Sequence, residues 1–163
     1  MMKTRNMTSL YLVRGNEILL LYRQGSRVAD GLWTGAAGGH FEEYELNDPE
    51  ACVLREMNEE LGLHRDDIKG LHLRYITLRR TKGEIRQNYF FFAALKETVP
   101  ADLTSNEGVL KWFPIDEIAM LEMPYSAKFV LRHYLTTGRA SNEIYVGVAD
   151  GNSVVFTPIS EYS

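Results

Sequence analysis

The sequence contains a single cysteine, Cys52, so no disulfide can form within the chain. A chain without disulfides fits a reducing compartment, and we expect a cytoplasmic protein. No apolar run approaches the ~20 residues that a membrane-spanning helix needs, and residues 1–10 lack the apolar core of a secretory signal peptide. The sequence therefore gives no indication of a membrane protein or a secreted protein.

Positive charge is also scarce, because 18 Lys and Arg residues face 22 Asp and Glu residues, a formal net charge of -4. This balance argues against a surface that binds a nucleic-acid polymer or an anionic membrane. It does not exclude a nucleotide as a small-molecule substrate, since metal ions can screen phosphates locally. The 163 residues, 45% of them hydrophobic, predict one domain over residues 1–163 with a core of its own.

Carboxylates are concentrated in one segment, residues 38–63, which holds eight of them. On a helix, Glu56 and Glu60 lie four positions apart and Glu59 lies three from Glu56, so these acids share one side. Like charges at this spacing repel one another. A hard divalent cation such as Mg²⁺ would relieve the repulsion, because it prefers carboxylate and phosphate oxygens. The alternative is an ordinary solvated helix face.

The signals around these acids predict a helix over residues 49–61. Asp48 is a favourable N-cap, Pro49 suits the first helical position, and Gly62 suits a left-handed end. An apolar stripe is expected to anchor this helix in the core: Ala51, Leu54, Met57 and Leu61.

The segment resembles the Nudix box: Gly, five residues, Glu, seven residues, then Arg-Glu-U-x-Glu-Glu-x-Gly-U, where U is aliphatic. The matching residues are Gly39, Glu45, Arg55, Glu56, Met57, Glu59, Glu60, Gly62 and Leu63. Nine residues rather than seven separate Glu45 from Arg55. The two extra residues fall near Asn47 and Asp48, in a loop where insertions cost little. The box therefore spans residues 39–63, with its helix unchanged.

This resemblance implies an α/β fold, a Nudix-type α/β/α sandwich with a mixed β-sheet. It also implies a hydrolase that depends on Mg²⁺ or Mn²⁺. By the family's pattern, the Gly38 carbonyl and the carboxylates of Glu56, Glu59 and Glu60 bind the metal. Glu59, Glu60 and Arg55 are the expected catalytic residues within the box.

Two other charged residues have alternative interpretations. Arg55 can pair with Glu59 or Glu45 and fix their rotamers, or form only an ordinary surface pair. The resemblance to purine triphosphate hydrolases of the MutT type suggests Glu107 as a general base or further metal ligand. A plain loop residue is an equally open interpretation of Glu107, and Glu84 is a weaker candidate for the same role.

Substrate contacts are expected outside the box. Arg23, at the end of a predicted strand, and Arg27, in the loop after it, are candidates for holding phosphates. Trp33, Thr34 and Tyr125 are candidates for contacting the base, although aromatic residues near strand ends often belong to the core.

The resemblance extends over most of the chain to the oxidised-purine nucleoside triphosphate hydrolases. In that group, a polar residue after a Trp and paired aspartates after a Trp-Pro step read the base. Here Tyr125 and Ser126 follow Met123-Pro124, where the aspartates would lie. The resemblance therefore carries over the reaction but not selectivity for 8-oxoguanine.

Alternation, aromatic runs and turn residues predict a mixed order of strands and helices. The predicted strands are 9–13, 17–24, 71–79, 84–95, 109–113, 144–149 and 153–158, with 33–41 extended. The further predicted helices are 116–120 and 125–135. The aromatic run 89–92 suggests a strand buried on both faces, and Asp150-Gly151-Asn152 predicts the turn of a C-terminal hairpin over residues 144–158.

Three functional hypotheses follow. The first is a nucleoside triphosphate pyrophosphohydrolase that yields a nucleoside monophosphate and pyrophosphate, with nucleotide-pool sanitising as an open role. The second is a hydrolase of ADP-ribose, a nucleotide sugar or a dinucleoside polyphosphate. The third is a noncatalytic nucleotide-sensing module, since fold alone does not fix function. A homodimer also remains open, with the 144–158 hairpin as either sheet extension or contact surface.

Overall fold

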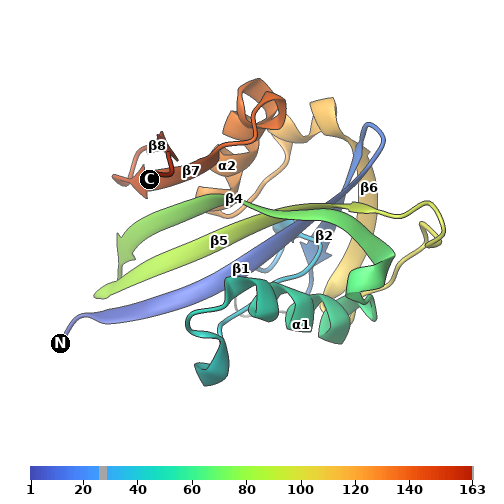
Figure 1. Ribbon diagram of the computed structural model, residues 1–163, viewed down its shortest axis with the longest axis horizontal. Coiled ribbons are helices and arrows are strands. Elements are labelled where there is room, and N and C mark those ends of the chain that lie inside the picture. The colour runs from blue at the N-terminus through green and yellow to red at the C-terminus, as the bar shows by residue number, and fades with distance from the viewer. Residues whose placement is uncertain (26–28, 163) are drawn as a thin grey trace.

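A mixed β-sheet forms the centre of the computed structural model, which describes residues 1–25 and 29–162 (Figure 1). Within these residues the sheet has eight strands. They are β1 (Lys3–Arg14), β2 (Glu17–Arg23), β3 (Trp33–Gly35), β4 (Ile68–Thr81), β5 (Glu84–Leu95), β6 (Gly108–Pro114), β7 (Ile144–Ala149) and β8 (Val154–Ile159). Their order is β3-β2-β1-β5-β4-β7-β8, and β6 pairs with β2. The β1–β5 and β4–β7 pairs are parallel, whereas the other strand pairs are antiparallel.

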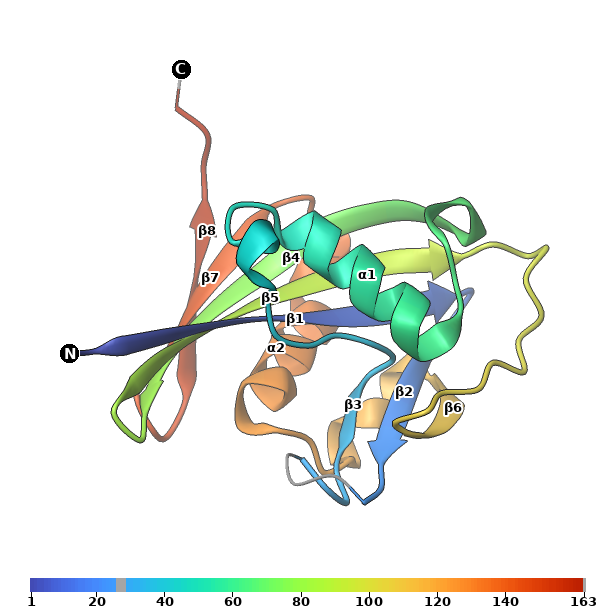
Figure 2. The same ribbon diagram turned by 90° about the horizontal axis from the view of Figure 1, so that it is seen from below.

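Two α-helices cover opposite faces of this sheet. Helix α1 (Pro49–Leu61) lies on one face and α2 (Tyr125–Thr136) on the other, as the two ribbon views show (Figures 1 and 2). Short 3₁₀ turns occupy connections: η1 (Glu43–Glu45), η2 (Arg65–Asp67), η3 (Ile115–Met120) and η4 (Gly138–Ala140). The expected α/β/α sandwich with a mixed sheet is confirmed. None of the helices in the described ranges is long and apolar enough to cross a membrane.

Each face of the sheet has its own hydrophobic core because successive side chains of a strand point to opposite faces. In β1, Leu10 and Leu12 belong to the core under α1, whereas Tyr11 belongs to the core under α2. In β5, Phe91 packs on the α1 side and Phe90 on the α2 side. The prediction of a strand buried on both faces is confirmed.

Helix α1 has the predicted bounds, but its buried face differs from the predicted stripe. The Asp48 carboxylate accepts a hydrogen bond from the backbone N–H of Ala51, and Gly62 adopts a φ of 69°. The buried row is Val53, Met57 and Leu61, with Cys52 beside it, whereas Ala51 and Leu54 are only half-buried. The buried row still repeats every four residues. Val53 takes the place of the predicted Leu54, because Val53 is the one that lies in the core under α1.

Several strands extend beyond their predicted ends. Strand β1 begins at Lys3, and its parallel pairing with β5 runs from Lys3↔Glu84 to Val13↔Ala94. Polar residues 3–6 give no strong strand signal, so pairing with β5 decides their conformation. The predicted C-terminal hairpin is present, and the Asp150 carboxylate accepts the N–H groups of its turn.

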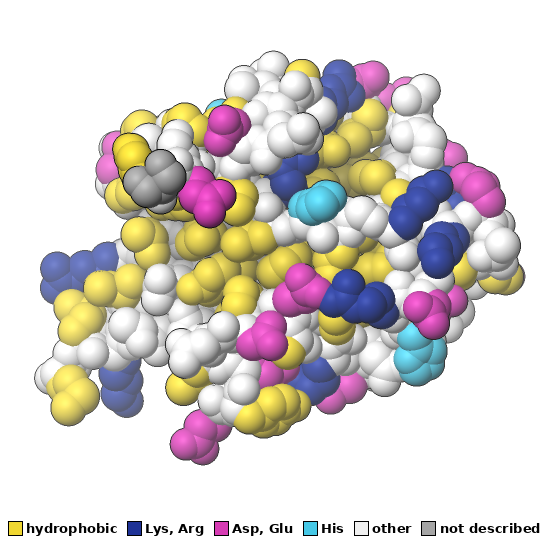
Figure 3. All heavy atoms as spheres, in the orientation of Figure 1, with side chains coloured by type: hydrophobic (Ala, Val, Ile, Leu, Met, Phe, Trp, Pro, Cys, Tyr) yellow, Lys and Arg dark blue, Asp and Glu magenta, His cyan; other side chains and the backbone are white. Residues whose placement is uncertain are grey.

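The surface seen in the first view separates apolar from charged side chains. Hydrophobic side chains form a band across the middle of this face, between α1 below and the C-terminal elements above (Figure 3). Acidic and basic side chains lie mixed below the band, over α1 (Figure 3). The charged side chains over α1 therefore border the apolar band.

Burial of α2 against the sheet predicts a clear stability difference between neighbouring residues. Leu131 is 2% exposed in the α2-side core, whereas Arg132 is exposed. Leu131→Ala should lower the free energy of unfolding by about 2–4 kcal/mol, because it removes buried methyl groups and leaves a cavity. Arg132→Ala should change it by less than ~0.5 kcal/mol. Urea denaturation measures both values, and equal effects would contradict this packing.

Candidate functional site

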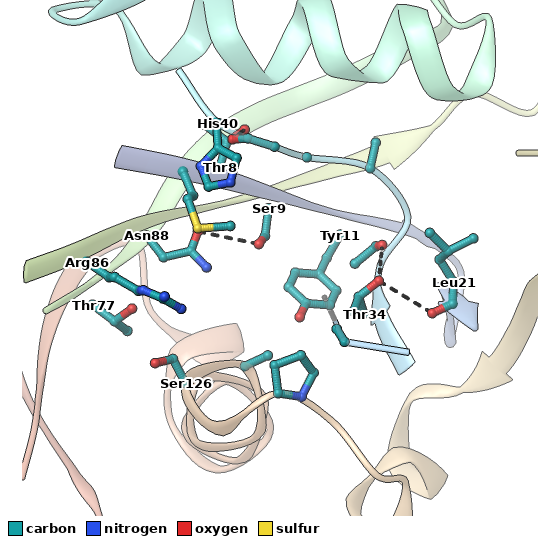
Figure 4. A pocket seen from close by; sticks show the side chains of 18 of the residues that line it. Thr8, Ser9, Tyr11, Leu21, Thr34, His40, Thr77, Arg86, Asn88 and Ser126 are labelled. Atoms are coloured by element: carbon teal, nitrogen blue, oxygen red, sulfur yellow. Dashed lines mark hydrogen bonds between the residues drawn. The ribbon is translucent and has the colours of Figure 1, made fainter. Parts of the chain in front are cut away.

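A cavity of about 380 Å³ lies between the sheet and the start of α2, within the range of ~300–1,000 Å³ typical of small-molecule sites. Side chains of β1, β4 and β5 form one wall, residues 124–127 face them, and the glycine-rich segment after β3 lies at one end (Figure 4). The residues at that end include Gly38, Gly39, His40 and Glu60. The cavity therefore extends from Glu60, near the C-terminal end of the acidic helix, to the space between the sheet and the start of α2.

Gly38 and Gly39, the glycine pair at the start of the box segment, leave room for close contacts. A Cβ on Gly38 would lie 2.2 Å from the Thr8 carbonyl oxygen, and the φ of Gly38 is 141°. A Cβ on Gly39 would lie 2.5 Å from Oε1 of Glu56. The Gly39 carbonyl accepts the Thr8 backbone N–H at 2.9 Å. Glycine at position 38 is therefore a steric requirement, because a Cβ there would meet the backbone of β1, whereas a Cβ at position 39 would meet only the movable end of the Glu56 side chain.

A buried ion pair anchors the loop before the acidic helix. The Glu45 side chain is 0% exposed and lies 2.9 Å from Nη2 of Arg55. Nε of Arg55 also donates to both Glu45 carboxylate oxygens, at 3.2 and 3.1 Å. The backbone N–H of Glu42 donates to Glu45 at 2.8 Å. Glu45 is thus fully engaged in holding the loop, whereas Arg55 still has donors for other groups.

The remaining donor group of Arg55 contacts two carboxylates of the Nudix box. Nη1 of Arg55 donates to Glu56 at 2.9 Å and to Glu59 at 3.1 Å. Hydrogen bonds to Glu45 and the neighbouring carboxylates raise the pKa of Arg55 above its usual range, despite some burial. Arg55 therefore contacts both predicted partners, and Glu56 as well.

Glu60 lies in a different environment. Its carboxylate accepts the Gly38 backbone N–H at 3.3 Å. Burial, followed by the negative charges of Glu56 and Glu107, raises the pKa of Glu60 from 4.5 to about 8. The carboxylates thus bring together more negative charge than the protein neutralises locally. This excess fits a divalent cation, which would favour the ionised form of Glu60.

The predicted metal ligands are not yet gathered around one point. Within residues 1–25 and 29–162, no three His, Cys, Asp or Glu side chains are arranged to hold a metal ion. The reason is geometric: Glu59 is turned towards Arg55, while Glu60 is hydrogen-bonded to Gly38.

Arg23 and Glu107 meet at the same end of the cavity. Nη2 of Arg23 lies 3.2 Å from Oε2 of Glu107, and Arg23 lines the cavity. The Glu107 backbone N–H donates to Ser105 Oγ, which fixes the turn before β6. The charge of Glu107 contributes to the raised pKa of Glu60, so the two acids are neighbours.

Two of the three candidate base-contacting residues line the cavity, and the third does not. Thr34 and Tyr125 line the cavity. Trp33 is not among the lining residues within the described ranges, and its ring packs against Tyr22 and Phe113 at centroid distances of 5.0 and 4.8 Å. Arg27 lies outside the described residues.

Other cavity residues were not anticipated from the sequence. They are Ser9, Thr77, Arg79, Arg86, Asn88 and Ser126. The sequence offers no clear signal for them, because Gln87 between Arg86 and Asn88 is polar as well, so polar and apolar side chains do not alternate there. Which face becomes a cavity wall depends on the position of α2.

The sequence pattern of the NUDIX domain family matches residues 2–134. The chain belongs to the Nudix domain family. The match covers the box, the sheet strands β1 to β6 and most of α2.

Solved structures support the same fold for this Nudix domain. A mutator MutT protein from Bacillus halodurans has a TM-score of 0.64 and 23% identity, with coverage of 94% of this chain and 97% of that one. A MutT NUDIX hydrolase from Burkholderia pseudomallei has a TM-score of 0.60 and 24% identity, with coverage of 80% and 97%. An Ap4A hydrolase from C. elegans has a TM-score of 0.62 and 17% identity, with coverage of 85% and 99%. At these identities the likeness is one of fold.

Family membership sets the general chemistry. This Nudix domain is a pyrophosphohydrolase that acts on a nucleoside diphosphate linked to another moiety. Nudix hydrolases generally use divalent metal ions, and the carboxylates at this end of the cavity fit that requirement.

The buried pair makes Glu45 a test of loop anchoring. Glu45→Gln should lower the free energy of unfolding by about 2–4 kcal/mol, because Arg55 loses its main charged partner. Glu43→Gln, beside it on the exposed side of the turn, should have an effect below ~0.5 kcal/mol. Guanidinium denaturation at neutral pH measures both. Similar values for the two variants would contradict the anchoring role.

The raised pKa of Glu60 predicts how metal-free stability depends on pH. Between pH 4.5 and about 8 the folded protein keeps a proton on Glu60 that the unfolded chain has lost. The free energy of unfolding should therefore fall as pH rises through this window, and Glu60→Gln should flatten the slope. Denaturation in EDTA at several pH values measures the slope. Equal slopes in the wild type and Glu60→Gln would contradict a raised pKa at Glu60.

Proposed function

We propose that this Nudix hydrolase is a Mg²⁺- or Mn²⁺-dependent nucleoside triphosphate pyrophosphohydrolase. It would convert an NTP or dNTP and water into a nucleoside monophosphate and pyrophosphate, with a role in sanitising the nucleotide pool. The observation that supports this proposal is the shape of the site. A cavity of about 380 Å³ meets the Glu60 end of the box helix, which leaves room for a nucleoside beside a charged phosphate chain.

The box residues have distinct proposed roles. The Gly38 carbonyl and the carboxylates of Glu56, Glu59 and Glu60 would hold the metal. When bound, the metal supplies charge screening for the phosphates and lowers the pKa of coordinated water. Arg55 would act as a positioning residue, because its guanidinium already contacts Glu56 and Glu59.

Arg23 and Glu107 are proposed to act on the phosphates and the attacking water. Arg23 lines the cavity and carries the positive charge needed to hold a phosphate oxygen. Its partner Glu107 would accept the proton from water as the water attacks phosphorus, while a phosphoric anhydride P–O bond breaks. Glu59 and Glu60 remain catalytic candidates through their place in the carboxylate cluster.

Thr34 and Tyr125 are proposed to contact the nucleoside. The Thr34 hydroxyl can donate its one proton to the carbonyl oxygen of Gly35 at 3.1 Å or of Leu21 at 3.4 Å, so its oxygen remains an acceptor. The Tyr125 hydroxyl donates to the Ser153 carbonyl at 3.0 Å, which holds its ring at the cavity wall. Trp33 would contribute indirectly, since its ring supports the strand that carries Thr34.

A second candidate is hydrolysis of a nucleoside diphosphate joined to a larger moiety, such as ADP-ribose, a nucleotide sugar or a dinucleoside polyphosphate. Two arginines on the sheet wall of the cavity, Arg79 and Arg86, favour a substrate with polar or charged groups there. The fold is also shared with a protein described as an Ap4A hydrolase. The nucleotide remains the proposed partner, with no nucleic-acid polymer.

A homodimer and a cytoplasmic location are further proposals. Within the described residues β8 forms an edge of the sheet, and Val155 and Ile159 on it are 63% and 46% exposed. Apolar side chains at an edge support contact through the 144–158 hairpin.

A substrate panel tests the reaction. With Mg²⁺ or Mn²⁺, the wild type should hydrolyse nucleoside triphosphates and release pyrophosphate rather than orthophosphate. Glu60→Gln should still bind nucleotide but lose about 10²- to 10⁴-fold in kcat, because it removes a proposed metal ligand. Glu50→Gln, in the first turn of the same helix, should retain full activity.

The outcomes separate the alternatives. Full activity of Glu60→Gln would disprove the metal assignment. Hydrolysis confined to ADP-ribose, nucleotide sugars or dinucleoside polyphosphates would favour the second candidate. Binding of nucleotides without turnover of any panel member would favour a nucleotide-sensing module.

A further inference from the structure

Two arginines face each other on the sheet wall of the cavity. Arg79 on β4 and Arg86 on β5 are direct cross-strand partners, and both line the cavity. Like charges directly opposite one another on a sheet destabilise it. The arrangement therefore has an electrostatic cost that a ligand of opposite charge would remove.

The protein supplies only part of the compensating charge. The Glu84 carboxylate lies 3.3 Å from Nε of Arg86 and 3.0 Å from Nε of Arg5, so two arginines share one acid. Arg79 has no ion-pair partner among the described residues, and its guanidinium lies 4.9 Å from the centroid of the Tyr125 ring. The charge of Arg79 is therefore not balanced by an acidic side chain among the described residues.

The Arg86 side chain points into the cavity. Because Nε of Arg86 is bound to Glu84, the two terminal nitrogens of Arg86 remain for other partners. Figure 4 shows the Arg86 side chain extending into the cavity, near Asn88 and Thr77 and across from Ser126 of α2. The Ser9 hydroxyl donates to Oδ1 of Asn88 at 3.4 Å, which leaves the Asn88 amide nitrogen as a donor.

The cavity lining carries more positive than negative charge. Among the described lining residues, Glu60 is the sole carboxylate, whereas Arg23, Arg79 and Arg86 are cationic. Arg79 and Arg86, with the Asn88 amide, present guanidinium and amide donors on the sheet wall. A neutral base would satisfy some of these donors but would leave the repulsion between Arg79 and Arg86. An anion would both accept the hydrogen bonds and remove the repulsion.

We propose that Arg79 and Arg86, assisted by Asn88, form a second anion subsite that binds a phosphate of the substrate remote from the scissile diphosphate. This assignment rests on the proposed function for the location of the scissile bond. Within the second candidate of the proposed function, it narrows the substrates to nucleotides that carry a further phosphate on the ribose or on the attached moiety.

Matched substrate pairs test this subsite. NADPH differs from NADH, and coenzyme A from dephospho-coenzyme A, by one phosphate remote from the diphosphate. Calorimetry in EDTA should show that the extra phosphate strengthens binding about 10- to 100-fold in at least one pair, as charge-assisted hydrogen bonds would. The same preference should appear in kcat/KM when Mg²⁺ is added.

Variants assign the preference to particular side chains. Arg79→Gln and Arg86→Gln should each remove most of the preference. Glu84→Gln should increase it, because Arg86 and Arg5 lose their shared acid. Arg80→Gln is the matched control: it also removes one positive charge from β4, but Arg80 is exposed and does not line the cavity within the described ranges. It should leave the preference unchanged.

Three results would overturn the subsite. One is equal binding within both pairs, and another is a preference that survives both arginine substitutions. The third is inorganic phosphate that binds alongside NADPH or coenzyme A with undiminished affinity, since the extra phosphate of these molecules should already occupy the subsite. Binding is measured without metal and does not depend on turnover. A failure to hydrolyse nucleoside triphosphates would therefore refute the proposed reaction but not the anion subsite.

Discussion

The buried contact between Glu45 and Arg55 is the interaction on which the site depends. A fully buried carboxylate is stable only with a partner, and losing that partner costs about 3–5 kcal/mol. Arg55 meets this need and joins the box loop to α1. The same guanidinium holds Glu56 and Glu59, so one residue links loop stability to the position of the acids. The two extra residues in the loop leave this contact intact.

Close backbone approach completes the acidic end of the cavity. Gly38 allows the loop to contact the backbone of β1 at distances that a side chain would prevent, and Gly39 leaves room for the Glu56 carboxylate in its present position. Glu60 is drawn into the same place by the Gly38 N–H and is partly removed from water. The protein has therefore concentrated carboxylates where their mutual repulsion is incompletely balanced. Such a site gains stability when a cation binds, which is the requirement of metal-dependent phosphate chemistry.

The sheet separates this chemistry from substrate recognition. Helix α1 presents its acids at one end of the cavity, whereas β4, β5 and α2 form the wall that surrounds the rest of the ligand. The wall has its own charge, centred on Arg79 and Arg86. The box can therefore define which bond is cleaved while a different surface selects the molecule that contains it. This division explains how one fold accommodates many nucleotide substrates.

Local sequence signals determined the reaction class and much of the secondary structure. Asp48, Pro49 and Gly62 define α1 because caps and helix ends depend on neighbouring residues. The box pattern identified the family, and family membership is confirmed. These features require only a few adjacent positions, so a single sequence reveals them.

Tertiary structure decided the remainder. The burial of Val53 rather than Leu54 on α1 and the packing of Trp33 against Phe113 both depend on segments distant in sequence. Strand register and helix placement arise from the combined burial of many side chains, which no local pattern specifies. The sequence by itself thus determined the acids and the helix that carries them. Only the folded sheet decided which polar side chains face the ligand, because that depends on which face α2 covers.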